Sequence, residues 1–67
     1  MKITAADKLK CVEKELSRRY REYPRKVDAN KMSQQQAERE LALFEEIAAD
    51  YTALVRTMEA AAEGVKP

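Results

Sequence analysis

The chain has 67 residues, 45% of them hydrophobic and 37% charged, and its formal net charge is +1. One cysteine and no histidine exclude an internal disulfide and the usual Cys/His zinc site, and no apolar run reaches the ~20 residues of a membrane span. We expect a single domain over residues 1–67. In a compact monomer of this size, apolar burial of roughly 100 kcal/mol would only balance a conformational-entropy cost of about 100 kcal/mol. The chain is therefore expected to need a partner chain.

The first predicted element is a helix over about residues 4–29. Glycine and proline are rare, and the composition is typical of an all-α protein. Thr4 followed by Asp7 is a capping pattern for the helix start. The apolar residues share a stripe about 80° wide, which predicts a narrow packing seam. The seam consists of Leu9, Val12, Leu16, Tyr20, Tyr23 and Val27.

Pro24 interrupts this helix. Proline removes one amide donor and clashes with the preceding turn, so we expect the first helix to be kinked near Pro24, at Arg21–Tyr23. The apolar pattern continues through Val27, which favours a bent helix over a break. A separate short helix that begins at Pro24 is the alternative.

A turn is predicted over residues 30–33. Asn30 tolerates the left-handed conformation that ends helices. Ser33 is the expected N-cap of the next helix, and Gln36 completes a Ser-x-x-Gln capping box. A short turn between two long helices predicts an antiparallel hairpin.

The second helix is predicted over about residues 34–63, with Gly64 just past its end. Its apolar residues form two rows. The first is an a/d repeat of Ala37, Leu41, Phe44, Ala48, Tyr51, Val55, Met58 and Ala62. The second row consists of Leu43, Ile47, Leu54 and Ala61 and widens the apolar stripe to about 160°.

A single antiparallel neighbour cannot cover so wide a stripe. We therefore expect two hairpins to form a homodimeric four-helix bundle. The face that forms the core and the dimer contact is predicted to contain Leu41, Leu43, Phe44, Ile47, Tyr51, Leu54, Val55 and Met58. Residues 1–33 carry a net charge of +5 and residues 34–67 a net charge of −4, which also favours docking of the two helices.

No catalytic, metal-binding or cofactor-binding residue is predicted, so we expect the protein not to be an enzyme. Histidine, the usual general acid or base, is absent. Cys11 lies away from the apolar stripe and is interpreted as a surface cysteine, with a reactive thiol beside lysines as the alternative. Glu45, Glu46 and Asp50 are expected to point into solvent, where they would not form a carboxylate metal site.

Four basic residues recur on the outer face of the first helix, namely Lys14, Arg18, Arg21 and Arg25. This basic stripe is either a solvated helix face or a surface that binds a protein partner, and Tyr23 beside Pro24 is included in the second interpretation. Nucleic acid is disfavoured because the net charge is only +1 and the second helix is acidic. A nucleic-acid accessory protein and a structural assembly subunit remain the alternatives.

One part of the chain resembles a known class of proteins. The residues concerned are Tyr23-Pro24-Arg25-Lys26-Val27, Asn30-Lys31-Met32-Ser33-Gln34, Ala37-Glu38-Arg39-Glu40, Phe44-Glu45-Glu46-Ile47 and Asp50-Tyr51. They resemble small helical-hairpin proteins of unknown activity that are encoded in bacteriophage and prophage regions. The resemblance implies a cytoplasmic protein of a bacterium or a phage-infected host. By analogy, we expect an accessory protein that docks on a host protein and modulates it.

Overall fold

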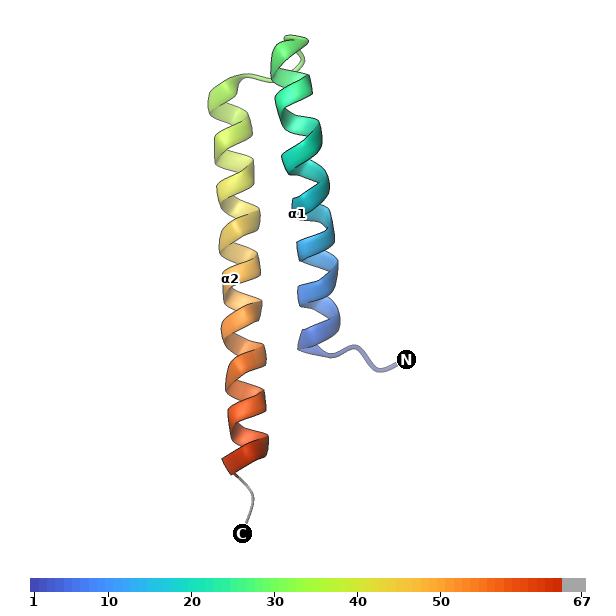
Figure 1. Cartoon of the computed structure of the whole chain (residues 1–67), viewed down its shortest axis with the longest axis vertical. Coiled ribbons are helices and arrows are strands. Elements are labelled where there is room, and N and C mark those ends of the chain that lie inside the picture. The colour runs from blue at the N-terminus through green and yellow to red at the C-terminus, as the bar shows by residue number, and fades with distance from the viewer. Residues whose placement is uncertain (65–67) are drawn as a thin grey trace.

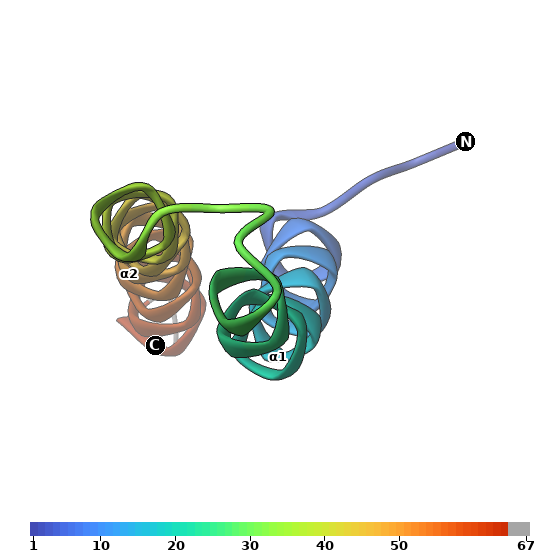
Figure 2. The same ribbon diagram turned by 90° about the horizontal axis from the view of Figure 1, so that it is seen from above.

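The computed structural model describes residues 1–64, which form two helices in a hairpin. Helix α1 spans Ala5–Asp28 and helix α2 spans Gln34–Gly64. The helices run side by side in opposite directions and are joined by one short connection (Figures 1 and 2). The described part of the chain contains no strand. The all-α hairpin is therefore confirmed, and each helix boundary lies within one residue of its prediction.

Local hydrogen bonds define both ends of α1. At the start, the Thr4 hydroxyl accepts a 3.1 Å hydrogen bond from the Asp7 amide, and the Asp7 carboxylate accepts a 3.0 Å bond from the Thr4 amide. At the end, Asn30 has a φ of 58°, which places it in the left-handed region. The Lys31 amide then donates back to the Lys26 carbonyl at 2.8 Å, as in a Schellman motif. These contacts are short-range, which is why sequence patterns predicted them.

Helix α1 continues through Pro24 as far as Asp28. The alternative of a separate helix that begins at Pro24 is therefore wrong. In α2, the Ser33 hydroxyl accepts a 3.0 Å hydrogen bond from the Gln36 amide, which confirms Ser33 as the cap. Gly64 is the last residue of α2, although we predicted it just beyond the helix.

The core is a single thin seam between the two helices. Its most buried residues are Tyr23, which is 6% exposed, and Ala37, which is 4% exposed. The remaining seam residues are half-buried, namely Leu9, Val12, Leu16, Val27, Leu41, Phe44, Ala48, Tyr51 and Val55. Two helices can enclose only one seam, so the molecule is elongated, with extents of 58 × 24 × 15 Å. Its radius of gyration is 16.1 Å, against about 11 Å for a compact chain of this length.

Three residues predicted on the seam lie outside it, namely Tyr20, Met58 and Ala62. Tyr20 is exposed because it lies at the edge of the α1 stripe. Met58 is exposed because it lies at the edge of the α2 stripe, where it lines an open groove beside the first turn of α1. Helix α2 itself continues past the start of α1 (Figure 1). The a/d repeat predicted which face of α2 meets α1, but not how far along α2 the contact extends.

Candidate functional site

The most distinctive surface of the molecule is an exposed row of large apolar side chains on α2. The row contains Leu43, Ile47, Leu54 and Met58, and we refer to it as the apolar row. Their exposed fractions are 50%, 40%, 46% and 53%, respectively. At 100° per residue, the row lies about 100° around α2 from the residues that face α1. The hairpin therefore buries one apolar face of α2 and leaves a second one in solvent.

The surroundings of the apolar row are mixed in character. A shallow depression of about 390 Å³ lies beside Leu43 and is lined by Glu38, Arg39, Ala42, Leu43 and Glu46. Near the open end of the hairpin, Val55 and Met58 line a second groove of about 260 Å³ with the first turn of α1. The exposed Asp50 lies beside the row, between Ile47 and Leu54 along the helix. At 100° per residue, Asp50 lies about 20° outside the arc that the row spans, whereas Glu40 lies at the same angle as Met58.

The basic stripe lies on the outer side of α1, and all four of its residues are exposed. Arg18 is held by two glutamates of the same helix, with its Nε 2.9 Å from Glu22 and its Nη1 3.9 Å from Glu15. The hydrogen bond from Arg18 lowers the pKa of Glu22. Within residues 1–62, the other three members of the stripe form no ion pair. The stripe is thus partly neutralised, as the solvated-face interpretation requires, but not fully.

Tyr23 does not belong to an exposed partner-binding surface, and this part of the prediction is wrong. The ring is buried against α2, because Tyr23 lies near the centre of the α1 stripe. Its hydroxyl donates a 2.9 Å hydrogen bond to the Glu40 carboxylate. Burial, together with this bond, raises the pKa of Tyr23. The packing interpretation of Tyr23, with its hydroxyl at the rim of the seam, is therefore confirmed.

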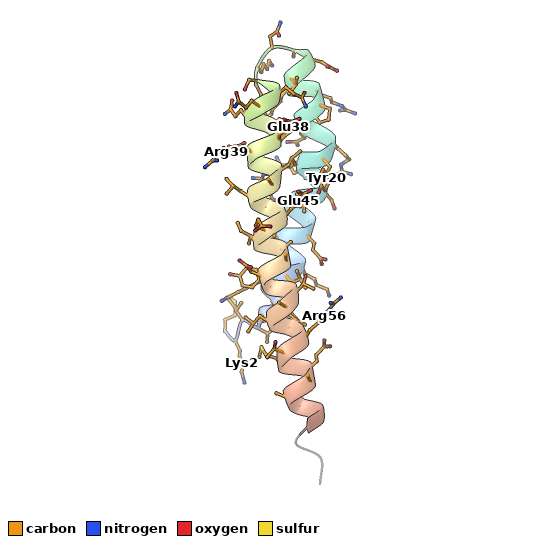
Figure 3. The ribbon with its side chains drawn as sticks, turned by 90° about the vertical axis from the view of Figure 1, so that its left-hand side faces the viewer. Lys2, Tyr20, Glu38, Arg39, Glu45 and Arg56 are labelled. Atoms are coloured by element: carbon orange, nitrogen blue, oxygen red, sulfur yellow. The ribbon has the colours of Figure 1, made fainter. Side chains whose placement is uncertain are left out.

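Sequence reasoning missed several polar contacts that tie the helices together. Arg19 of α1 lies over the Phe44 ring of α2, with the guanidinium carbon 4.1 Å from the ring centroid. The Arg19 guanidinium also pairs with Glu15, which raises the pKa of Arg19. Tyr20 donates a hydrogen bond to Glu45, and Figure 3 shows these two side chains next to each other.

Another missed contact is the hydrogen bond between Tyr23 and Glu40 described above. The positions of these residues could have predicted the contacts. Arg19 flanks the apolar stripe of α1, and the acceptors Glu40 and Glu45 flank that of α2, where long side chains reach across a helix pair. Glu45 is exposed, as expected, but its carboxylate accepts a hydrogen bond from Tyr20 of α1. The three ion pairs among residues 1–62 all lie within α1, so opposite net charges do not join this part of the helices through direct pairs.

The remaining candidate groups are dispersed. Cys11 is exposed. In the described residues, no three cysteine or carboxylate side chains converge as metal ligands would. Over residues 1–64, neither helix combines the length and apolar character that are needed to cross a bilayer. What the arrangement offers chemically is contact surface: one apolar row on α2 and one basic stripe on α1.

The chain matches no protein-family model, no curated protein and no solved structure. The resemblance to phage-encoded hairpins therefore stays a prediction, and function has to be inferred from the two surfaces.

Proposed function

We propose that this protein is a non-enzymatic helical interaction module that associates with a second copy of itself into a four-helix bundle. The observation that carries the proposal is the apolar row, in which four large side chains on one face of α2 are each 40% exposed or more. Isolated apolar residues are common on protein surfaces, whereas a contiguous row marks a binding face. A two-fold dimer covers such a row with its own copy.

The exposed area of the chain supports this proposal. The chain exposes 5721 Å², whereas surface scaling gives about 4,300 Å² for a compact monomer of 7.7 kDa. The excess is therefore about 1,400 Å². A stable interface of ordinary size buries about 800 Å² on each partner. The excess area is more than enough to supply one such interface.

Sedimentation equilibrium tests the proposed dimer. The wild-type chain is expected to sediment with twice the monomer mass at micromolar concentration, and its melting temperature should rise with concentration. The double variant Leu43→Lys, Leu54→Lys should sediment as a monomer or lose helicity. The matched control is Ala49→Lys, Ala60→Lys, which places lysines with the same spacing at exposed positions on the side of α2 away from the row. A folded wild-type monomer whose melting is independent of concentration would overturn the proposal.

We further propose that the basic stripe docks an acidic protein surface in a bacterial or phage-infected cytoplasm. The supporting observation is that Lys14, Arg21 and Arg25 are exposed and form no ion pair within the described residues. The stripe lies opposite the α1 seam, so it stays accessible when the apolar row is covered. A bend at Pro24 is part of this proposal, because it would set the direction of the last turn of α1, which carries Arg25.

Affinity capture from host lysate tests the docking surface. The variant Arg21→Glu, Arg25→Glu should lose a partner that wild type retains. The control Arg39→Glu, Arg56→Glu, which reverses two exposed arginines of α2, should keep it. Retention on DNA or RNA that falls steeply with salt would instead identify a nucleic-acid accessory protein. Stoichiometric incorporation into a larger particle would identify an assembly subunit.

A further inference from the structure

We propose that the two copies pack with their α2 helices parallel at the centre of the dimer and their α1 helices on opposite outer sides. This inference rests on the dimer proposed above and specifies its arrangement. The two-fold axis then runs along the α2 pair, so that each residue of the apolar row meets the same residue of the partner. The occupant of the row is therefore the same row of an identical chain, pointing in the same direction.

The two helices differ in the number of apolar faces that they carry. On α2, the apolar row lies about 100° from the residues that face α1, so α2 can pack against two neighbours. On α1, a single stripe about 80° wide contains the seam residues, and this stripe already packs against α2. A helix with two apolar faces suits the centre of an assembly, whereas a helix with one suits the outside.

The side of α1 that lies next to the apolar row is charged. Two contacts identify this side: Lys8 Nζ lies 5.9 Å from the centroid of the Tyr51 ring, and the Arg19 guanidinium carbon lies 4.1 Å from that of Phe44. At 100° per residue, Tyr51 and Phe44 are the two seam residues nearest to the row around α2. All five α1 residues in the corresponding 60° arc are charged, and we refer to them as the charged flank. They are Lys8, Glu15, Arg19, Glu22 and Lys26.

The charged flank distinguishes parallel from antiparallel packing. Because the row lies about a quarter-turn around α2 from α1, an axis that makes the α2 helices antiparallel leaves both α1 helices on the same side of the pair. Their charged flanks would then face each other inside the bundle. An axis along the α2 pair places the α1 helices on opposite sides and keeps the two flanks apart. Packing charged side chains against each other removes them from water at a cost, so the parallel arrangement is favoured.

The outer edge of the apolar row complements the charged flank. This edge carries Arg39, Glu46 and Asp50, which lie about 20–60° beyond the row on the side away from α1. Two acidic residues and one basic residue give the edge a net charge of −1, whereas three basic and two acidic residues give the flank +1. In the parallel arrangement, the edge of one chain is the part of α2 nearest to the charged flank of the partner. In the antiparallel arrangement, it would meet the same acidic edge of the partner.

Neutralising the acidic edge tests this complementarity. The double variant Glu46→Gln, Asp50→Asn should raise the dimer Kd about two- to fivefold at low salt, because the edge then attracts the partner's flank less strongly. The control Glu38→Gln removes an exposed carboxylate from the side of α2 away from the row and should leave the Kd unchanged. A Kd that stays the same or falls contradicts the parallel arrangement, since only antiparallel packing brings the two acidic edges together.

Cysteine cross-linking tests the orientation directly. In a Cys11→Ser background, Leu54→Cys places a thiol near the middle of the arc of the apolar row. Under mild oxidation, the parallel arrangement predicts a covalent dimer of this chain alone. An antiparallel pair that matches row with row sets Leu54 opposite the partner's Ile47, so only a mixture of Ile47→Cys and Leu54→Cys chains would cross-link. That result would overturn the proposal.

The native cysteine gives a second measurement in the unaltered sequence. Cys11 lies on α1 and is exposed, so it can carry a spin label. At the 8–10 Å spacing of packed helices, α1 helices on opposite sides of the α2 pair have axes about 20 Å apart. The two labels should therefore lie at least about 20 Å apart in the dimer. Antiparallel packing would instead place the two α1 helices, and with them the labels, side by side.

Sedimentation of the same samples separates this inference from the proposed function. If the chains are dimeric but the Cys11 labels lie close together, or if no cysteine sample cross-links, the arrangement is wrong and self-association stands. If the wild-type chain is a folded monomer, the proposed dimer fails, and this inference fails with it. If Leu54→Cys dissociates the dimer, the distance between Cys11 labels in the otherwise native chain decides the arrangement.

Discussion

Truncation of Tyr23 should be the most damaging single change in the hairpin. The ring is 6% exposed and is the largest buried side chain of the seam. A tyrosine that removes roughly 150 Å² from water contributes about 4 kcal/mol at ~25 cal/mol/Å². Aromatic-to-alanine changes in cores cost a similar amount, about 3–5 kcal/mol. Because a two-helix seam has few other buried contacts, we expect Tyr23→Ala to leave the chain largely unfolded.

Urea denaturation followed by circular dichroism measures this effect at one fixed protein concentration, since self-association would shift the midpoint. Tyr20→Ala is the matched control, because Tyr20 lies on the same helix and also bonds a glutamate, yet is 47% exposed. Its midpoint should stay close to that of wild type. Equal shifts for the two variants, or a loss below about 1 kcal/mol for Tyr23→Ala, would refute burial as the source of stability.

The hydroxyl of Tyr23 can be assessed separately from its ring. Tyr23→Phe keeps the packing and removes the 2.9 Å hydrogen bond to Glu40, so it should cost about 1 kcal/mol. In a double-mutant cycle with Glu40→Gln, the double variant should lose less stability than the sum of the two single losses, because both changes affect the same hydrogen bond. Independent, additive losses would mean that the two groups do not interact in solution.

Three further predictions concern the loop, the proline and alkaline pH. Asn30→Gly should stabilise the hairpin by up to about 1 kcal/mol, since glycine adopts a φ of 58° without strain, and Asn30→Val should destabilise it in thermal melts. Pro24→Ala should stabilise α1 by about 1–3 kcal/mol and raise its helicity, because it restores an amide donor, and a loss of stability would contradict this. Burial and the Glu40 hydrogen bond raise the pKa of Tyr23 above its ordinary value of 10.0. The folded state therefore holds this proton more tightly than the unfolded chain, and stability should be constant below about pH 10 and fall above it, less so in Tyr23→Phe. Alkaline melts of both proteins test this, and identical profiles would show that Tyr23 is not responsible.

Much of this fold could be predicted from the sequence because it depends on short-range interactions. The Thr4 and Ser33 caps, the left-handed Asn30 and the helix boundaries are set by hydrogen bonds between residues at most five apart. The two apolar rows of α2 follow from helical periodicity alone. For the same reason, the residues of the basic stripe and of the apolar row are exposed, as their positions around the two helices predict. Tyr23 is the exception, because it is buried.

Only the tertiary structure decided how the two helices are placed against each other. Periodicity puts Tyr20 and Tyr23 on one stripe, but the rotation of α1 against α2 buries Tyr23 and leaves Tyr20 exposed. The axial offset of the helices leaves Met58 at an open groove beside the first turn of α1 and brings Arg19 over Phe44. Rotation and offset depend on side-chain shapes across the whole seam, and these are contacts between residues far apart in the chain. No local pattern encodes them, because each helix has the same periodicity whichever neighbour it meets.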